Sequence, residues 1–275
     1  MITAFLTTLE EMTKILLFVI IGFALNRLNI LPKSVGSAIS RLITILFLPA
    51  LQLYSNMTEF NLKDIADYGA LVALGALFWG AITLLAFPVS KKLAGGNIED
   101  KGVFQYGLSF SNTGAVGIPL VLAFFGTAGL FKFGLFLLVG TIMTYAWGVS
   151  LFFGDDLRAS FRQFIVHMLN PVFIAMIIGF ILGSLSAKNW MPKLVINLVG
   201  DLAGCYVPMS LISVGFAIAE YPLRSIIKLP KGYLFTVLRL IVIPALAILA
   251  AWVFGLSKEI ATFIVLGFAN PCGMN

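Results

Sequence analysis

The sequence has few charged residues for its length. Asp, Glu, Lys and Arg make up 11% of the 275 residues, whereas soluble domains usually carry about 25%. A chain with so little charge lacks the polar surface to cover a water-soluble globule. Lipid is the solvent that fits a composition that is 60% hydrophobic with a mean hydropathy of +1.03. In that setting the net charge of +6 does not indicate nucleic-acid binding.

Histidine and cysteine are also scarce, which narrows the classes of function. Cys205 and Cys272 both lie in apolar stretches and predict no disulfide framework. The only histidine, His167, stands beside a basic loop, and the sequence has no His-Glu-x-x-His motif. No cofactor or metal is therefore expected, and a membrane-embedded enzyme is a disfavoured alternative. Glu10 and Glu11 precede the first apolar run, where a cleavable signal would have basic residues.

Long apolar runs dominate what remains. A membrane-spanning helix needs about 20 largely apolar residues, and the sequence predicts nine such helices, joined by short polar connections. The fold class expected is therefore an all-α polytopic membrane protein. The nine predicted spans are Thr7–Leu28, Ser37–Ser55, Ala66–Phe87, Gly102–Phe125, Phe131–Phe153, Pro171–Leu185, Leu194–Ala219, Tyr233–Phe254 and Lys258 to the end.

The basic residues are unevenly shared between the two sides. One set of alternating connections carries 12 of the 18 Lys and Arg residues, and the other set carries 6. Because excess Lys and Arg mark the cytoplasmic face, we expect a multi-pass protein of the cell (inner) membrane whose N-terminus lies outside.

The chain shows signs of an internal repeat. Three short segments of the first half recur in the same order in the second, at offsets of 157, 160 and 159 residues. The alternative is that apolar helices with prolines resemble one another by chance. The three matches are Gly22–Leu25 with Gly179–Leu182, Leu31–Lys33 with Met191–Lys193, and Leu48–Leu51 with Val207–Ser210.

The repeat makes the first and sixth spans equivalent, and an odd number of spans between the copies inverts one relative to the other. Inverted repeats are common in secondary transporters. We expect a first repeat over residues 1–154 (spans 1–5), a cytoplasmic connecting loop over 155–170 and a second repeat over 171–275 (spans 6–9). Because a full second copy would have five spans, the final part of helix 9 and helix 10 are expected to be missing from a truncated chain.

Two of the predicted spans combine Asn, Pro and Gly. The fourth contains Ser111–Leu120 and the ninth contains Ala269–Asn275, and the repeat offset makes these stretches correspond. Proline removes a backbone donor and clashes with the preceding turn, and glycine loosens the helix further. We therefore expect the fourth span to break near Gly117–Pro119.

A broken helix leaves N–H and C=O groups free in the middle of the membrane. The N-terminal ends of half-helices suit a carboxylate, and paired interrupted spans at matching positions indicate a transporter site. The alternative is a Pro/Gly kink that serves only packing. The substrate-binding residues expected here are Asn112, Gly114, Gly117, Pro119, Asn270, Pro271, Gly273 and Asn275.

Further polar residues lie within the predicted spans. Asp201, in the seventh span, is a candidate for coupling transport to protons, or is a paired or hydrated residue near a helix end. Arg41 and Arg239 lie near the basic side and are expected to snorkel to the interface. Four residues that follow Pro49 or Pro208 either line the cavity or form hydrogen bonds between helices. They are Gln52, Ser55, Ser210 and Ser213, and all but Ser210 are also expected to bind substrate.

Three runs, Asn112–Pro119, Pro208–Gly215 and Ala269–Gly273, resemble the auxin efflux carrier family, which includes plant auxin exporters and bacterial permeases. This resemblance, to a bacterial member, covers essentially the whole chain. It implies two inverted five-helix repeats, both termini outside, and broken helices 4 and 9 that cross at the substrate site, in a fold similar to bile acid:sodium symporters. By resemblance, Asn112, Gly117 and Pro119 belong to the first crossing segment, and Asn270 and Pro271 to the second.

The expected function is secondary active transport of a small organic anion by alternating access. The substrate would be auxin-like or a dicarboxylate such as malonate or malate, and protons or the membrane potential would drive transport. One alternative is a sodium-coupled organic anion symporter, and another is a non-transporting scaffold or receptor, or an inactive truncated paralogue. Expected partners are the organic anion, protons or sodium, the lipid bilayer and a second copy of the chain in a homodimer, but no nucleic acid.

Overall fold

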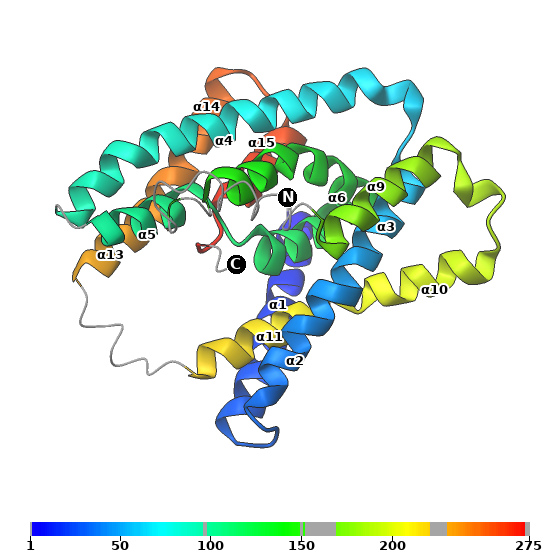
Figure 1. Ribbon diagram of the computed structural model, residues 1–275, viewed down its shortest axis with the longest axis horizontal. Helices are drawn as coiled ribbons and strands as arrows, with labels where there is room; N and C mark the ends of the chain where they lie inside the picture. Colours follow the sequence, from blue (N-terminus) through cyan, green and yellow to red (C-terminus); the bar gives the residue numbers. More distant parts are fainter. Residues whose placement is uncertain (1, 96–97, 149–150, 152–168, 221–229, 273–275) are drawn as a thin grey trace. The chain divides into compact units, whose positions relative to one another are not determined.

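The computed structural model describes residues 2–95, 98–148, 151, 169–220 and 230–272, and every regular element in these ranges is a helix (Figure 1). Five helical segments of the described chain are long and apolar enough to cross a bilayer. This confirms an all-α, multi-pass membrane protein. The five are Ser34–Glu59, Leu62–Ala94, Ile118–Met143, Lys193–Glu220 and Gly232–Val253.

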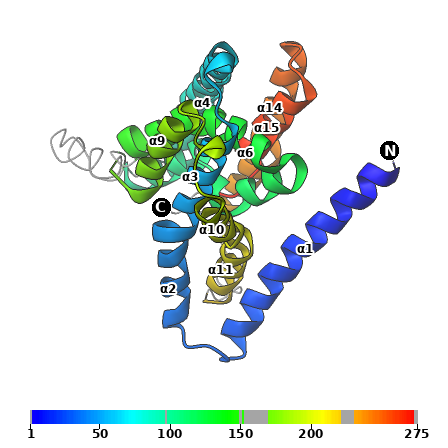
Figure 2. The same ribbon diagram turned by 90° about the vertical axis from the view of Figure 1, so that its right-hand side faces the viewer.

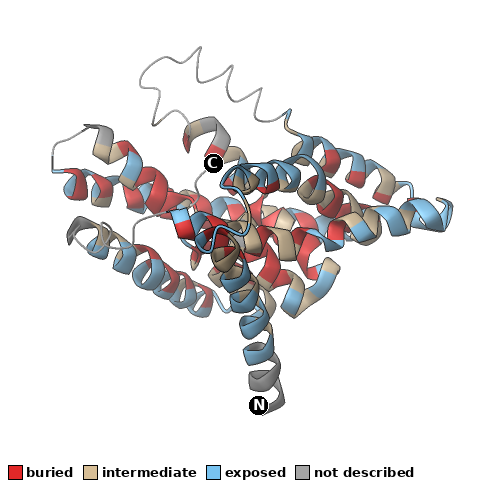
Figure 3. Cartoon of the chain, turned by 90° about the horizontal axis from the view of Figure 1, so that it is seen from below, coloured by how far each residue is buried: buried red, intermediate tan, exposed pale blue. Residues whose placement is uncertain are grey.

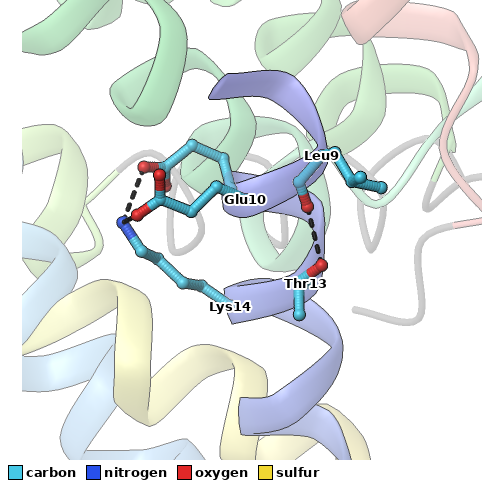
Figure 4. A network of polar contacts seen from close by, with 5 residues as sticks. Leu9, Glu10, Thr13 and Lys14 are labelled. Carbon is cyan, nitrogen blue, oxygen red and sulfur yellow. Dashed lines mark hydrogen bonds and ion pairs between the residues drawn. The ribbon is translucent and has the colours of Figure 1, made fainter. Parts of the chain in front are cut away.

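Two further predicted spans are helical but fall outside that group. The helix α9 (Pro171–Ser184) is apolar but has only 14 residues. The helix α1 (Ile2–Arg27) has 26 residues, and its described part is mostly exposed (Figure 3). Lys14 of α1 forms ion pairs with Glu10 at 3.1 Å and Glu11 at 2.9 Å (Figure 4). Lys14 therefore offsets one of the two negative charges in the first half of this apolar helix.

The chain divides into two compact units, and each unit takes segments from both halves of the sequence. Unit 1 comprises Met1–Lys63, Ile118–Phe131 and Asn170–Arg224, and unit 2 comprises the remainder. Within unit 1, α1 packs along α11 (Tyr206–Glu220; Figure 2) and α9 packs along α3 (Leu48–Glu59). The first span thus pairs with the seventh and the sixth with the second. Equivalent halves would give this reciprocal pairing.

Unit 1 also contains the short helices α2 (Ser34–Leu42) and α10 (Lys193–Gly204), and the helix α6 (Ile118–Met143) belongs to it up to Phe131. In unit 2, α4 (Ile65–Ala94) packs along α5 (Ile98–Ser109), and α14 (Ile243–Val253) packs against α15 (Lys258–Phe268). The helix α13 (Pro230–Val237) precedes α14. Short 3-10 helices, η2 (Leu62–Asp64) and η5 (Ala187–Asn189), occupy connections.

Glycines at equivalent places allow the helices of unit 1 to pack closely. A Cβ atom on Gly22 of α1 would lie 2.0 Å from the carbonyl oxygen of Ile212 in α11. A Cβ atom on Gly179 of α9, 157 residues later, would lie 2.8 Å from the Cβ of Asn56 in α3. The recurring glycine therefore allows a close helix approach in both pairs, to the backbone of α11 in one and to a side chain of α3 in the other, as small residues do in membrane helix interfaces.

Proline explains three irregular stretches within the helices. Proline has no N–H group and its ring clashes with the carbonyl four residues earlier, so a widened turn before it relieves the clash. Three π-helical segments each end two residues before a proline at the second position of the next α-helix. They are η1 (Ile43–Phe47, before Pro49), η3 (Thr113–Gly117, before Pro119) and η6 (Leu238–Val242, before Pro244).

Replacing Gly215 of α11 by alanine is expected to lower the thermal stability of the detergent-purified protein. The added Cβ would lie 1.9 Å from the carbonyl oxygen of Val19 in α1, so the two helix backbones would have to separate. Overpacking of this kind costs about 1–3 kcal/mol. The matched control is Gly69→Ala in α4, where a Cβ meets nothing within 4 Å. Equal melting temperatures for the two variants would contradict the close helix contact.

Candidate functional site

The fourth predicted span is interrupted before Thr113. The helix α5 ends at Ser109, residues 110–112 are not helical, and η3 begins at Thr113. The break therefore lies earlier than predicted, because η3 accommodates Pro119 without opening the helix at Gly117–Pro119. Gly126 interrupts the helix that follows, with φ 64° and ψ −160°, a conformation open to glycine. This agrees with the predicted end of the fourth span at Phe125.

The ninth predicted span is interrupted at the matching place. The helix α15 ends at Phe268, and the described chain after Ala269 is not helical. The N–H group of Asn112 donates to the carbonyl oxygen of Pro271 at 2.8 Å, and Ser111 and Cys272 form an isolated antiparallel bridge. The two breaks therefore cross and pair within unit 2, and we call Phe110–Asn112 with Ala269–Cys272 the crossover.

Side chains lock the two segments of the crossover together. The hydroxyl group of Ser111 donates to the carbonyl of Gly267, in the last turn of α15. Asn270 is 2% exposed, and its amide donates back to the carbonyl of Leu266. A Cβ on Gly117 would lie 3.0 Å from that Asn270 amide nitrogen, so η3 rests directly against the end of α15.

A buried arginine joins both segments. Arg239 of η6 is 1% exposed. Its Nε donates to the carbonyl of Asn270 at 3.1 Å, and its Nη1 donates to the carbonyl of Leu108 at 2.7 Å. The prediction that Arg239 snorkels to the membrane interface is wrong, because the carbonyls at the ends of α5 and α15 hold the guanidinium inside unit 2.

Aromatic rings surround the same helix ends. The ring of Trp79 in α4 lies 4.7 Å from that of Phe268 and stacks on Phe110 at 6.1 Å, measured between centroids. Phe136 of α6 meets Phe268 edge-on at 6.4 Å. These large buried rings exclude water from the helix ends, which strengthens the polar contacts among them.

The other predicted site residues are divided between the units. Asn112 and Gly114 are half-buried beside the break, whereas Pro119 is buried in the part of α6 that belongs to unit 1. Asn270 and Pro271 lie in the crossover. Gly273 and Asn275 lie outside the described residues.

The remaining four candidates, Gln52, Ser55, Ser213 and Asp201, all belong to unit 1. Gln52 is half-buried in α3, and Asp201 is exposed on α10. The hydroxyl group of Ser55 donates to the carbonyl of Thr127 at 3.2 Å, and the hydroxyl groups of Ser213 and Ser40 lie 3.0 Å apart. The two serines thus form the hydrogen bonds between helices that were the alternative to a cavity lining.

Comparison with known proteins gives the family. A family model described as "Membrane transport protein" matches residues 7–163 and 157–275. The chain belongs to this family, the auxin efflux carrier family. One relative is an uncharacterized transporter of Methanocaldococcus jannaschii, 23% identical over 239 residues, which cover 85% of this chain and 75% of the relative. Another, from Methanothermobacter thermautotrophicus, is 22% identical over 275 residues, which cover 98% of this chain and 87% of that protein.

Membership of this family establishes the general class of function. The protein is a membrane transporter, and its lipid bilayer and a transported substrate follow from that. No group of three or more His, Cys, Asp or Glu residues in the described ranges could hold a metal ion. The polar groups at the crossover are backbone N–H and C=O groups, the amides of Asn112 and Asn270 and the guanidinium of Arg239.

Replacing Gly117 by valine is expected to destabilise the crossover, because the new side chain would displace the Asn270 amide and press on the carbonyl of Leu266, 3.3 Å from the Cβ position. We expect a loss of about 1–3 kcal/mol, measured as a lower melting temperature in detergent. Gly134→Val in α6 is the control, since nothing lies within 4 Å of its Cβ position. A variant at Gly117 as stable as the one at Gly134 would refute this packing.

Proposed function

We propose that this transporter is a secondary active carrier of a small organic anion, auxin-like or a dicarboxylate such as malonate or malate, that works by alternating access. The observation that carries the proposal is the crossover, in which two broken helices satisfy each other's backbone through the Asn112–Pro271 hydrogen bond. Discontinuous helices that meet in this way form the substrate sites of many secondary transporters.

The chemistry around the crossover favours an anion over a cation. The segment that begins at Thr113 presents a half-helix N-terminus, which carries partial positive charge. Arg239 adds a full positive charge at the ends of α5 and α15, and none of the ion pairs in the described ranges includes it. Asn112 and Gly114 are half-buried, so a carboxylate reaching the break would lie beside the amide side chain of Asn112 and the positive end of the half-helix.

The energy source is proposed to be protons or the membrane potential. Asp201, an exposed carboxyl on α10, is the candidate for a proton carrier. A sodium-coupled symporter remains the alternative within transport, and a receptor or an inactive paralogue the alternative outside it. We further propose that the protein lies in the inner membrane with its N-terminus outside, on the strength of the uneven distribution of Lys and Arg.

The proposed orientation is testable by cysteine labelling. In a background with Cys205 and Cys272 replaced by serine, Lys188→Cys is expected to react with a membrane-impermeant maleimide added to intact cells. Lys92→Cys is expected to react only after the membrane is opened, because both lysines are exposed but belong to connections on opposite predicted sides. The reverse labelling pattern would place the N-terminus inside.

The transport proposal is tested with radiolabelled dicarboxylates and indole-3-acetate. We expect saturable uptake into proteoliposomes, reduced by about 10-fold or more in Asn112→Ala, since a lost donor to a bound carboxylate costs about 1.5–3 kcal/mol. A proton gradient is expected to raise the rate if protons drive transport.

The matched control is Asn189→Ala, an exposed asparagine in unit 1, whose uptake should equal that of the unmodified protein. Equal uptake by the Asn112 and Asn189 variants would rule out a site at the break. A folded protein that takes up none of these acids would favour the receptor or inactive alternative.

A further inference from the structure

Arg239 is a charge in an unusual setting. It lies in the membrane-spanning segment Gly232–Val253, is 1% exposed, and is joined to no acidic side chain in the described ranges. An ionised side chain inside a membrane protein is costly and is normally paired or functional. Within the described ranges, groups other than carboxylates therefore compensate the guanidinium.

Two helix ends supply that compensation. Leu108, whose carbonyl accepts from Nη1 at 2.7 Å, lies in the last turn of α5. Asn270, whose carbonyl accepts from Nε at 3.1 Å, lies two residues after α15 ends. Carbonyls at helix C-termini carry partial negative charge, so the cation draws together two ends that would otherwise repel each other.

The same kind of carbonyl binds sodium in secondary transporters with broken helices, where unwound carbonyls and C-terminal ends of half-helices coordinate the ion. We propose that Arg239 is a resident cation of the crossover, occupying the place of a sodium ion and making assembly of the crossover independent of sodium. The expectation that transport needs no sodium also rests on the function proposed above. The expectation that the crossover assembles without sodium does not rest on it.

The opposite half of the repeat lacks this charge. Trp79 lies 160 residues before Arg239, as Pro32 lies 160 residues before Pro192. Trp79 contacts Phe110, which follows α5, and Phe268, which ends α15. The two equivalent positions thus press on the same pair of helix ends, one with a neutral indole and one with a cation. The arginine is therefore a feature of the second half alone and not a requirement of the shared helix packing.

The test uses the detergent-purified protein without substrate, unfolded thermally in equal concentrations of sodium chloride or choline chloride. We expect the unmodified protein to melt at the same temperature in both salts. Arg239→Gln removes the charge and is expected to melt about 5 °C lower or more in choline chloride. Sodium should restore much of the loss, increasingly with its concentration, because an ion that binds only the folded state stabilises it.

Two further variants separate charge from geometry. Arg239→Lys keeps a cation and is expected to stay independent of sodium and closer in stability to the unmodified protein than Arg239→Gln. Lys92→Gln removes an exposed lysine of unit 2 and is expected to be insensitive to the choice of salt. If the glutamine variant does not fold in choline chloride, its recovery only when prepared in sodium is the expected result.

Three results would overturn the proposal. They are sodium stabilisation of the unmodified protein, an Arg239→Gln variant whose stability or recovery sodium does not change, and a lysine variant as unstable as the glutamine variant. Uptake compared in the two salts tests the consequence for transport. If the protein behaves as expected in the unfolding test but transports no acid, the proposal of a resident cation is supported and only the proposed substrate is contradicted.

Discussion

The hydrogen bond from the N–H group of Asn112 to the carbonyl of Pro271 is the contact on which the crossover depends. Inside a bilayer, backbone groups freed by a broken helix find no water, and each unsatisfied group costs several kcal/mol. A single broken helix would be untenable there. The two breaks pair with each other through this bond and the bridge between Ser111 and Cys272, so each interruption helps to satisfy the backbone of the other.

The position of Arg239 and the packing of the neighbouring residues are consequences of this contact. Once two helix C-termini are brought together, their carbonyls concentrate partial negative charge, and the guanidinium of Arg239 binds there. The buried rings of Trp79 and Phe268 pack against each other at the end of α15. Gly117 leaves the room that lets η3 approach the Asn270 amide. Backbone pairing, ion–dipole attraction and packing thus act on the same few residues.

Much of this arrangement was predictable because membrane helices and their interruptions leave patterns in short stretches of the sequence. Apolar length predicted the spans, and the combination of Asn, Pro and Gly predicted the two interruptions. The end of the fourth span at Phe125 was also predicted. The break itself was misplaced toward Pro119, since a sequence does not tell whether a widened turn will accommodate the proline or the helix will open several residues earlier.

Arg239 was mispredicted for a different reason. It lies six residues after Tyr233, a depth of about 9 Å along a helix, from which a long side chain can reach the interface. What holds it inside is a pair of carbonyls, at Leu108 and Asn270, that are remote in the sequence or belong to another helix. Such a contact leaves no local pattern. The roles of Asp201 and of the membrane orientation stay predictions, because they concern protons and sides of the bilayer rather than contacts within a unit.

The crossover also has a consequence for biosynthesis. Asn112 and Pro271 are 159 residues apart in the chain, and ribosomes add roughly 5–20 residues per second. The first broken helix is therefore made about 8–30 s before the segment that completes its backbone pairing. The interval between the synthesis of Leu108 and that of Arg239 is only slightly shorter. During that interval the nascent fourth span carries free polar groups that only the insertion machinery, lipid headgroups or water can satisfy. Final folding of unit 2 is accordingly tied to the synthesis of α15 and the segment that follows it, so the order and speed of synthesis bear on how this protein folds.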